Sequence, residues 1–482
     1  MISYRKLAMR VLGHSPVSAV KTARRSTAKR ATALALTAAL VVGMTLPAFA
    51  DTWYIEDGDI SISAGENGNN VAQGGGRTKE NDTDTVITNR ESTASSNTVT
   101  IDAGEGKTVD VTLDNVNINT SETGGAAVSV TGKGDTNIEL DGNNTLTSGY
   151  YHAGLEHNKT DDSGTLTITD NNNDGKLTAN GGYKGAGIGG GYSSNGTVTI
   201  TGGDINANGG YKGAGIGGGY FGNGTVKITD GDINANGGYK GAGIGGGNEK
   251  DGQVTITGGE IIANGGDGSA GIGGGYSGNG TVTISGGTVT EASGGGEGAG
   301  IGGGDSGNGT VNISGGTITK ASGGYYGAGI GGGSSGLGNV SIEGNVTIKN
   351  AQGGVGAAGI GGGARGTSDA AGNGNKISIK STAAGSPNIT AKGGKASDDG
   401  LSGGAAIGSG SVVAGATEVK SDITIEGKVT INATGGGNVA IGDNIDGEKV
   451  FNGLAGGTNI KRTANGKDVT QDGDCLLYTS DA

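Results

Sequence analysis

The residues of this 482-residue chain that could bind a ligand recur at a nearly fixed spacing. A tyrosine followed by a lysine returns three times at one position of an internal repeat, and a second group of tyrosines follows the sequence Gly-Gly-Gly. Tyrosine rings on a regular lattice could stack against sugar faces, while their hydroxyls and the lysines meet sugar hydroxyls or uronate groups. The alternative is that the rings only shield glycine backbone. The candidate carbohydrate-binding residues are Tyr183, Lys184, Tyr192, Tyr211, Lys212, Tyr220, Tyr239, Lys240 and Tyr276.

A second periodic set is acidic. Asp204, Asp232 and Glu260 occupy equivalent positions, and Thr288 and Thr317 continue the series. Carboxylates about 5 Å apart repel each other by about 1 kcal/mol in water and by about 3 kcal/mol at an effective dielectric constant of 20. A bound Ca²⁺ would relieve this repulsion, as would neighbouring lysines. We therefore take the three acids as candidate Ca²⁺ ligands, with simple solvated acids as the alternative, and expect no other cofactor.

Catalytic side chains are scarce after residue 50. The histidines there are His152 and His157, and the cysteine is Cys475. A β-helix polysaccharide lyase needs a lysine or arginine base beside Ca²⁺-binding carboxylates, and no single copy of the repeat concentrates these groups. We assign both histidines to a corner of the fold and predict a protein that is not an enzyme. A pectate-type polysaccharide lyase is the alternative.

The glycines around Gly185, Gly187 and Gly190 match the dinucleotide-binding pattern G-x-G-x-x-G. That pattern holds pyrophosphate only between a strand and the N-terminus of a helix. Here the three glycines recur together in five copies of the repeat, with strand-like sequence on both sides. We therefore exclude phosphate binding at this motif.

These residues are positioned by a repeat that contains the sequence Gly-Ala-Gly-Ile-Gly-Gly-Gly. Its period is about 28 residues in the first copies and lengthens to about 30 residues in the last, a size that indicates one structural unit stacked many times. Weaker copies surround Leu155, Ile407 and Ile441. The isoleucines of the clear copies are Ile188, Ile216, Ile244, Ile272, Ile301, Ile330 and Ile360.

Each copy contains three short segments in which apolar residues alternate with polar residues or glycine. In one copy these segments cover residues 186–188, 197–201 and 204–208. Alternation with β-branched residues and flanking glycines predicts strands. Their few apolar side chains can be buried only if each copy stacks on the next. We therefore predict an all-β fold, a right-handed parallel β-helix (solenoid) with coils of about 28–30 residues and three short strands per coil.

Two sets of asparagines recur with the same period. We expect amide side chains stacked from coil to coil in the first set, as in the asparagine ladders of cross-β structures. The second set precedes glycine at another turn, and an aspartate replaces asparagine in one copy. The first set is Asn180, Asn208, Asn236 and Asn264; the second is Asn195, Asn223, Asp251, Asn279 and Asn308.

Part of the less regular upstream sequence resembles a known family. The segments 106–118, 125–130 and 137–146, within a match over about residues 98–150, are similar to the clostridial β-helix carbohydrate-binding domain family. The resemblance implies a fold like that of polysaccharide lyases, and cellulose or acidic-sugar binding on bacterial surfaces. It transfers no individual ligand residue to this chain.

The beginning of the chain has the features of a secretory signal peptide. Basic residues between Arg5 and Arg30 precede the apolar run 31–46, and Ala48-Phe49-Ala50 provides a cleavage site. We expect residues 475–482 to be the translation of a sequencing adapter, and native residues beyond them to be missing. The expected segments are 1–50, the signal peptide; 51–150, an N-terminal cap with divergent coils; 151–365, regular glycine-rich coils; 366–474, divergent C-terminal coils; and 475–482, the adapter.

Charge narrows the choice of partners. The signal segment holds eight basic residues and no acidic one, which leaves 25 basic and 46 acidic residues, or a net charge of −21. Such an acidic protein is a poor ligand for nucleic acid or anionic lipid, and no apolar run after residue 50 is long enough to span a membrane. We expect a polysaccharide or a host or plant glycan as the partner, with cell-wall attachment through a missing C-terminal region.

Together these features predict a secreted or cell-surface bacterial protein. Its expected function is adhesin-like carbohydrate binding without catalysis. The alternatives are a polysaccharide lyase and a purely structural surface stalk.

Overall fold

The computed structural model covers most of the chain after residue 50. The expectations for residues 1–50 and 475–482, including Cys475, lie outside the residues that it describes. In the described part, no helix is long and apolar enough to cross a membrane. The described residues are 51–365, 374–398, 400–412, 419–443, 446–451, 454 and 457–471.

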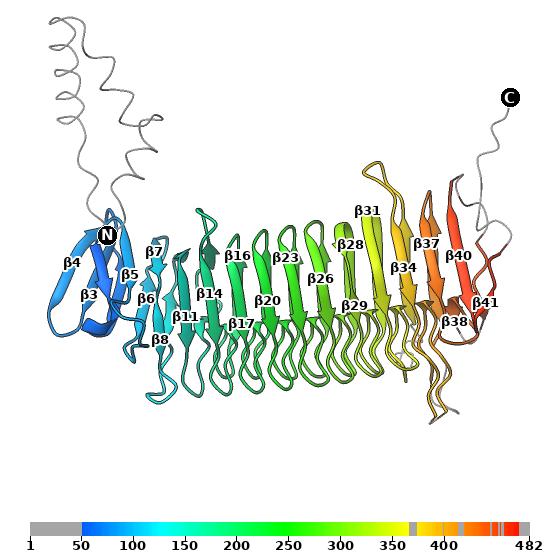
Figure 1. Cartoon of the computed structure of the whole chain (residues 1–482), viewed down its shortest axis with the longest axis horizontal. Helices are drawn as coiled ribbons and strands as arrows, with labels where there is room; N and C mark the ends of the chain where they lie inside the picture. The colour runs from blue at the N-terminus through cyan, green and yellow to red at the C-terminus, as the bar shows by residue number, and fades with distance from the viewer. Residues whose placement is uncertain are drawn as a thin grey trace, which may run out of the picture. The chain divides into compact units, whose positions relative to one another are not determined.

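These residues form a parallel β-helix, as the repeat predicts, in which successive coils stack side by side (Figure 1). Each regular coil contributes one strand to each of three parallel sheets. The first sheet consists of β2 (Ile60–Ala64), β6 (Val99–Ala103), β9 (Val128–Gly132), β12 (Leu155–Lys159), β15 (Ile188–Gly189), β18 (Ile216–Gly217), β21 (Ile244–Gly245), β24 (Ile272–Gly273), β27 (Ile301–Gly302), β30 (Ile330–Gly331), β32 (Ile360–Gly361), β35 (Ile407–Gly408) and β38 (Ile441–Asp443).

The second and third sheets carry the longer strands. The second consists of β1 (Asp51–Tyr54), β5 (Thr85–Thr88), β7 (Thr108–Asp114), β10 (Asp135–Asp141), β13 (Leu166–Thr169), β16 (Asn195–Ile200), β19 (Gly224–Ile228), β22 (Gly252–Ile256), β25 (Gly280–Ile284), β28 (Gly309–Ile318), β31 (Gly338–Gln352), β33 (Asn375–Lys380) and β36 (Ser421–Glu426). The third consists of β8 (Asn117–Asn119), β11 (Asn143–Thr147), β14 (Lys176–Asn180), β17 (Asp204–Asn208), β20 (Asp232–Asn236), β23 (Glu260–Asn264), β26 (Thr288–Ser293), β29 (Ala321–Ser322), β34 (Asn388–Lys392), β37 (Thr430–Thr434) and β40 (Asn459–Ala464), with β28 and β31 running on into it.

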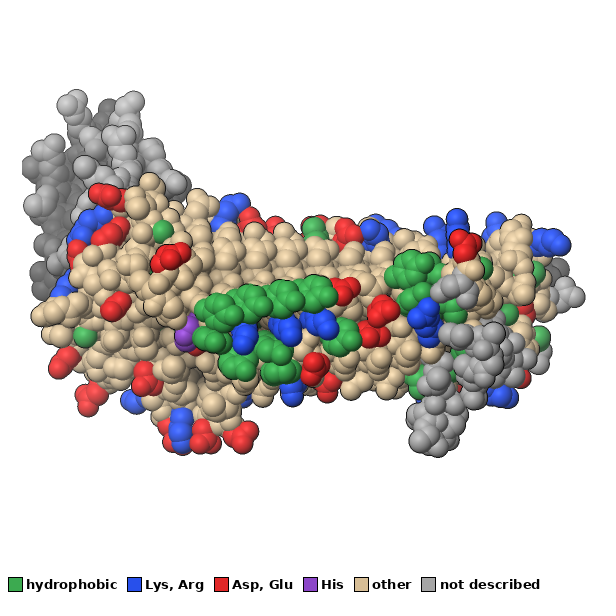
Figure 2. All heavy atoms as spheres, turned by 90° about the horizontal axis from the view of Figure 1, so that it is seen from below, with side chains coloured by type: hydrophobic (Ala, Val, Ile, Leu, Met, Phe, Trp, Pro, Cys, Tyr) green, Lys and Arg blue, Asp and Glu red, His purple; other side chains and the backbone are tan. Residues whose placement is uncertain are grey.

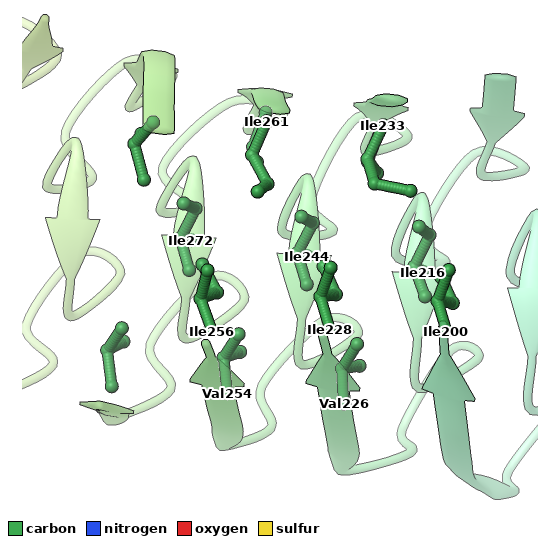
Figure 3. Packing of buried hydrophobic residues seen from close by; sticks show 14 of the residues in the cluster. Ile200, Ile216, Val226, Ile228, Ile233, Ile244, Val254, Ile256, Ile261 and Ile272 are labelled. Carbon is green, nitrogen blue, oxygen red and sulfur yellow. The ribbon is translucent and has the colours of Figure 1, made fainter. Parts of the chain in front are cut away.

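The core is a set of apolar columns that run along the stack, as predicted. Equivalent side chains pair in register, so that Ile188, Ile216 and Ile244 lie one above another in the first sheet. Figure 3 shows the isoleucines and valines of neighbouring coils pointing into the same narrow interior. The six alternating apolar residues of one coil are all buried: Ala186, Ile188, Val198, Ile200, Ile205 and Ala207.

The first strand of each regular coil is shorter than its alternation predicts. β15 has two residues, and Ala186 lies before it. The backbone N–H of Ala186 donates to the carbonyl of Gly190 in its own coil, 3.0 Å away, whereas the N–H of Ile188 donates to Gly215 of the next coil. The glycine-rich backbone therefore turns sharply on both sides of one isoleucine instead of continuing as a strand.

Both asparagine sets bond from coil to coil, but in different ways. In the first set, Asn208 Nδ2 donates to Asn180 Oδ1 at 2.9 Å, and Asn236 repeats the contact with Asn208 at 3.0 Å. This is the predicted amide ladder. In the second set, the oxygen of Asn195 accepts the backbone N–H of Asn223 at 2.8 Å. The second position needs only an acceptor, which explains why Asp251 can replace asparagine there.

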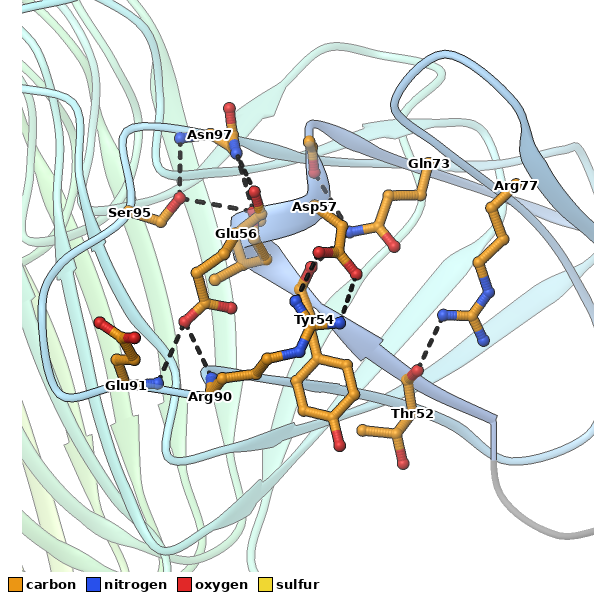
Figure 4. A network of polar contacts seen from close by, with 12 residues as sticks. Thr52, Tyr54, Glu56, Asp57, Gln73, Arg77, Arg90, Glu91, Ser95 and Asn97 are labelled. Carbon is orange, nitrogen blue, oxygen red and sulfur yellow. Dashed lines mark hydrogen bonds and ion pairs between the residues drawn. The ribbon is translucent and has the colours of Figure 1, made fainter.

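The N-terminal end differs from the repeat. The 3₁₀ turn η1 (Ile55–Asp57) and an antiparallel meander of β2, β3 (Asn69–Gln73) and β4 (Arg77–Asp82) lie there. The buried Trp53 indole donates to Asp82 at 3.0 Å. Figure 4 shows the neighbouring network, in which Arg90 binds both carboxylate oxygens of Asp57 at 2.5 and 2.6 Å.

At the other end, short antiparallel strands lie against the last coils. β39 (Gly447–Glu448) pairs with β38, and β41 (Lys467–Asp468) pairs with β40. Arg462 replaces alanine in a core column and is fully buried. Its guanidinium donates to Glu448 at 3.1 Å and to the carbonyl of Lys449 at 2.6 Å. A buried cation at this position is therefore held by both a charge and the backbone.

Candidate functional site

The sequence-predicted tyrosines and lysines lie on both sides of the narrow first sheet. One corner, which leads from the third sheet into the first, carries Tyr211 and Lys212; the other, which leads from the first sheet into the second, carries Tyr220. Figure 2 shows these side chains as green rows with blue groups between them. We call the set the tyrosine–lysine strip: Tyr150, Tyr151, Tyr183, Lys184, Tyr192, Tyr211, Lys212, Tyr220, Tyr239, Lys240 and Tyr276.

Four tyrosines at the first corner form a stacked ladder. The ring centroids of Tyr183 and Tyr211 are 5.0 Å apart with planes 5° apart, and those of Tyr211 and Tyr239 are 5.1 Å apart at 12°. Tyr150 extends the ladder at 4.8 Å and 22°. Each of the four is between 41% and 49% exposed. Because the inner rings cover one another, they present edges and hydroxyls to solvent and not the ring faces that we expected to stack on sugars.

The second corner carries a looser aromatic column, which Tyr151 joins from the position of Lys184 at the first corner. Tyr151, Tyr192 and Tyr220 are tilted, with centroids 5.4 and 5.8 Å apart and planes at 49° and 36°. Phe221 stacks on Tyr220 with centroids 3.8 Å apart. Tyr276 does not join them, because the coil between carries Asn248 at the equivalent position. The two columns therefore differ in order as well as in composition.

The lysines of the first corner reach across the sheet to the aromatic rings of the second. The Nζ atoms of Lys184 and Lys212 lie 4.5 Å from the centroids of Tyr192 and Tyr220, and that of Lys240 lies 3.6 Å from Tyr276. The residues between the corners that face outward are glycines, so no side chain blocks this path. The glycines of the repeat thus make a flat floor on which cation–π contacts form.

Acidic residues bound the strip at one end. Asp267 stands one repeat after Tyr239, where the ladder would continue, and raises the pKa of the Tyr239 hydroxyl through its charge and a hydrogen bond. Glu297 and Asp305 lie beyond it. Burial raises the pKa of both carboxyls, and the charge of Asp305 raises that of Glu297 further. An anionic ligand would meet repulsion here.

The other end of the strip lies in a coil that departs from the repeat. His152 and Glu156 replace two motif glycines, Gly185 and Gly189. His152 Nδ1 lies 3.0 Å from the buried Glu156 carboxylate, which also accepts the N–H of Ala153 at 3.0 Å. This contact raises the pKa of His152.

Two residues of this coil were missed as site residues in the sequence. Tyr150 and Tyr151 belong to the degenerate copy around Leu155, and alignment of that copy with Tyr183 and Lys184 would have revealed both. His157 is buried in strand β12 and not at the corner to which we assigned it, and its Nδ1 donates to the carbonyl of Thr197, 2.9 Å away. Burial lowers its pKa.

The acidic set lies on a different face from the strip. Asp204, Asp232 and Glu260 are in register along the third sheet, one per coil. Lys176 precedes them in the column and pairs with Asp204 at 2.6 Å, which raises the pKa of the lysine. Within the described residues, no three or more His, Cys, Asp or Glu side chains gather closely enough to hold a metal ion. Calcium binding at this column stays a prediction.

Comparison with known proteins supports the repeat. Searches of curated proteins and of solved structures gave no significant match. The chain is similar to the family model described as Beta helix repeat over residues 172–192, 198–220, 226–248, 254–276, 282–305 and 311–334.

Proposed function

We propose that this parallel β-helix is an exported, adhesin-like bacterial surface protein that binds polysaccharide along the tyrosine–lysine strip without catalysis. The observation that carries the proposal is the strip itself. Six of its tyrosines are more than 40% exposed and lie together on one face: Tyr150, Tyr151, Tyr183, Tyr192, Tyr211 and Tyr239. A contiguous exposed patch of aromatic side chains marks an interaction site.

The strip suits an extended glycan that lies parallel to the stack. Its rings repeat at 4.8 to 5.1 Å, so a regular polymer can make the same contact at successive coils. Ring edges supply apolar contact, and phenol hydroxyls both donate and accept hydrogen bonds. Lys184, Lys212 and Lys240 add positive charge on an otherwise acidic protein, which favours glycans that carry carboxylates.

Affinity electrophoresis against cellulose, pectate and host glycans tests this proposal. We expect retardation by at least one glycan, and loss of it when Tyr183, Tyr211 and Tyr239 are all changed to alanine. A matched control changes Thr197, Thr225 and Thr281, which repeat on the second sheet, to alanine. If no glycan retards the protein, it is a structural stalk. Repeating the assay with EDTA tests the predicted calcium at Asp204, Asp232 and Glu260.

Polysaccharide lyase activity is a second candidate, favoured by one observation. His152 is held by a buried carboxylate at the end of the strip, and a histidine oriented in this way can transfer protons. Release of unsaturated uronate from pectate, measured by its ultraviolet absorbance, would favour the lyase. Its loss in His152→Ala, with glycan retardation unchanged, would assign the activity to this residue.

A further inference from the structure

We propose that the stacked ladder Tyr150, Tyr183, Tyr211 and Tyr239 is a site of oxidative cross-linking, where neighbouring rings of one molecule couple to dityrosine. The inference goes beyond glycan binding and does not depend on it. It rests on three neighbouring ring pairs with centroids 4.8, 5.0 and 5.1 Å apart. Each ring is also 41% to 49% exposed, so a soluble oxidant can reach it.

The near-parallel arrangement brings the reacting atoms of adjacent rings close together. The planes of Tyr183 and Tyr211 differ by only 5°, and the side chains project from equivalent corner positions of successive coils. The ring carbons next to each hydroxyl therefore face the neighbouring ring. A tyrosine side chain turns about two bonds, and rings at an exposed corner can rotate from this contact into a bonded biaryl.

The oxidant is a haem peroxidase with hydrogen peroxide. Two tyrosines each give up one electron and the phenolic proton, and one hydrogen peroxide molecule takes both electrons and both protons to become two water molecules. The two phenoxyl radicals then form a carbon–carbon bond between positions ortho to oxygen. Each bonded carbon loses its hydrogen as a proton, and each oxygen regains one. The product has two phenols and two fewer hydrogen atoms than the reactants.

Proximity favours coupling within one molecule. Even a short flexible tether gives a millimolar effective concentration, which is about a thousand times that of a micromolar protein solution. Rings already in contact exceed that value. Coupling between molecules is therefore expected to be the minor reaction in dilute solution, although the exposed rings permit it.

Other tyrosine pairs of the protein are less suited to this reaction. Tyr192 and Tyr220 are 5.8 Å apart and tilted by 36°. Tyr325 and Tyr326 meet edge to face at 77°, and Tyr326 is only 8% exposed. Tyr325 is nevertheless 57% exposed, so it is as open to the oxidant as the ladder rings. It provides the matched control for exposure without stacking.

The experiment treats the dilute full chain with peroxidase and hydrogen peroxide. Dityrosine fluorescence is measured on the monomer band of a denaturing gel, and cross-linked peptides are mapped by mass spectrometry. We expect fluorescence in the monomer and links between Tyr150, Tyr183, Tyr211 or Tyr239. In Tyr211→Phe the monomer fluorescence should fall by roughly half or more, because three neighbouring pairs become one. In Tyr325→Phe it should not change.

Three results would overturn the proposal. They are dityrosine only in covalent dimers, mapped links that avoid the ladder, or equal monomer fluorescence in Tyr211→Phe and the parent. Circular dichroism shows whether each variant keeps the β-helix. Tyr211→Phe removes only an exposed hydroxyl, so we expect this variant to fold like the parent. If its folding is altered, Tyr183→Phe serves as a second ladder variant. Glycan retardation is measured separately, so failure of cross-linking leaves the binding proposal intact.

Discussion

The first coils and the regular coils differ in the side chains that they bury. Between residues 51 and 159, eleven polar side chains are buried, whereas the described residues between 160 and 361 contain three. The first coils also use Trp53 and leucines in the core, whereas the coils from β15 to β32 use Ile, Val and Ala. In a regular coil, the identical neighbours satisfy the backbone, so glycine is sufficient. Near the end of the stack, side chains such as Asp82 and Asn69 must replace the missing neighbour.

The largest expected effect is a charge in a regular column. Ile216→Asp places a carboxylate between Ile188 and Ile244, where no polar partner is available. We expect the free energy of unfolding to fall by several kcal/mol, on the order of 4 or more, because burial of an unpaired ion costs that much. Urea unfolding followed by circular dichroism measures this loss. The control Thr225→Asp, on an exposed outward position, should stay within about 0.5 kcal/mol.

Glycine substitutions compare the two regions directly. Gly217 in the regular coils has φ +130°, and an added Cβ would overlap the carbonyl oxygen of Gly245. Gly106 in the first coils has φ +69°, with nothing within 4 Å of an added Cβ. We expect Gly106→Ala to cost about 1–2 kcal/mol from backbone strain alone. Gly217→Ala should cost about 3 kcal/mol or more, because overpacking adds to strain. Equal urea midpoints for the two variants would show that close packing of the coils at Gly217 adds nothing to the backbone strain.

The two asparagine sets should respond differently to aspartate. Asn236 both donates to Asn208 and accepts from Asn264, so Asn236→Asp loses a donor and places a charge in the amide ladder. We expect a loss of about 1–3 kcal/mol. Asn195 only accepts a backbone N–H, so Asn195→Asp should change stability by less than about 0.5 kcal/mol. Thermal unfolding of both variants measures the difference, and equal losses would contradict the acceptor-only role.

The smallest expected effect is a pH dependence of the protein's stability that arises from the two histidines of the irregular coil, residues 152–157. Hydrogen bonding to Glu156 raises the pKa of His152. Its stabilising contribution is therefore complete below the unfolded value of about 6.5 and is lost as pH rises through the higher folded value. Burial lowers the pKa of His157, so its contribution is present above about 6.5 and is lost as pH falls through the lower folded value. His152→Gln should remove only the alkaline decline in the melting temperature. A decline unchanged in that variant would show that other groups cause it.

The fold class and the core columns were predictable because they depend only on register. Once coils are parallel, residues one repeat apart must be neighbours, which places Ile216 over Ile188 and Asn208 over Asn180. The geometry of the strip was not predictable in the same way. Ring orientation depends on side-chain torsions, and the path of Lys212 to Tyr220 depends on glycines that leave the outward face empty. The pairing of His152 with Glu156 depends on how one irregular coil turns.

Because the coils have nearly identical sequences, a strand of the folding chain could pair in the wrong register, one coil too early or too late. The changes in coil length limit this error. Thr290 is an extra residue that bulges between Val289 and Glu291, at the step where the repeat first becomes longer. A chain slipped by one coil would set this bulge against a strand that has no room for it. The irregular coil lengths therefore favour the correct pairing register of strands along the stack over registers slipped by one coil.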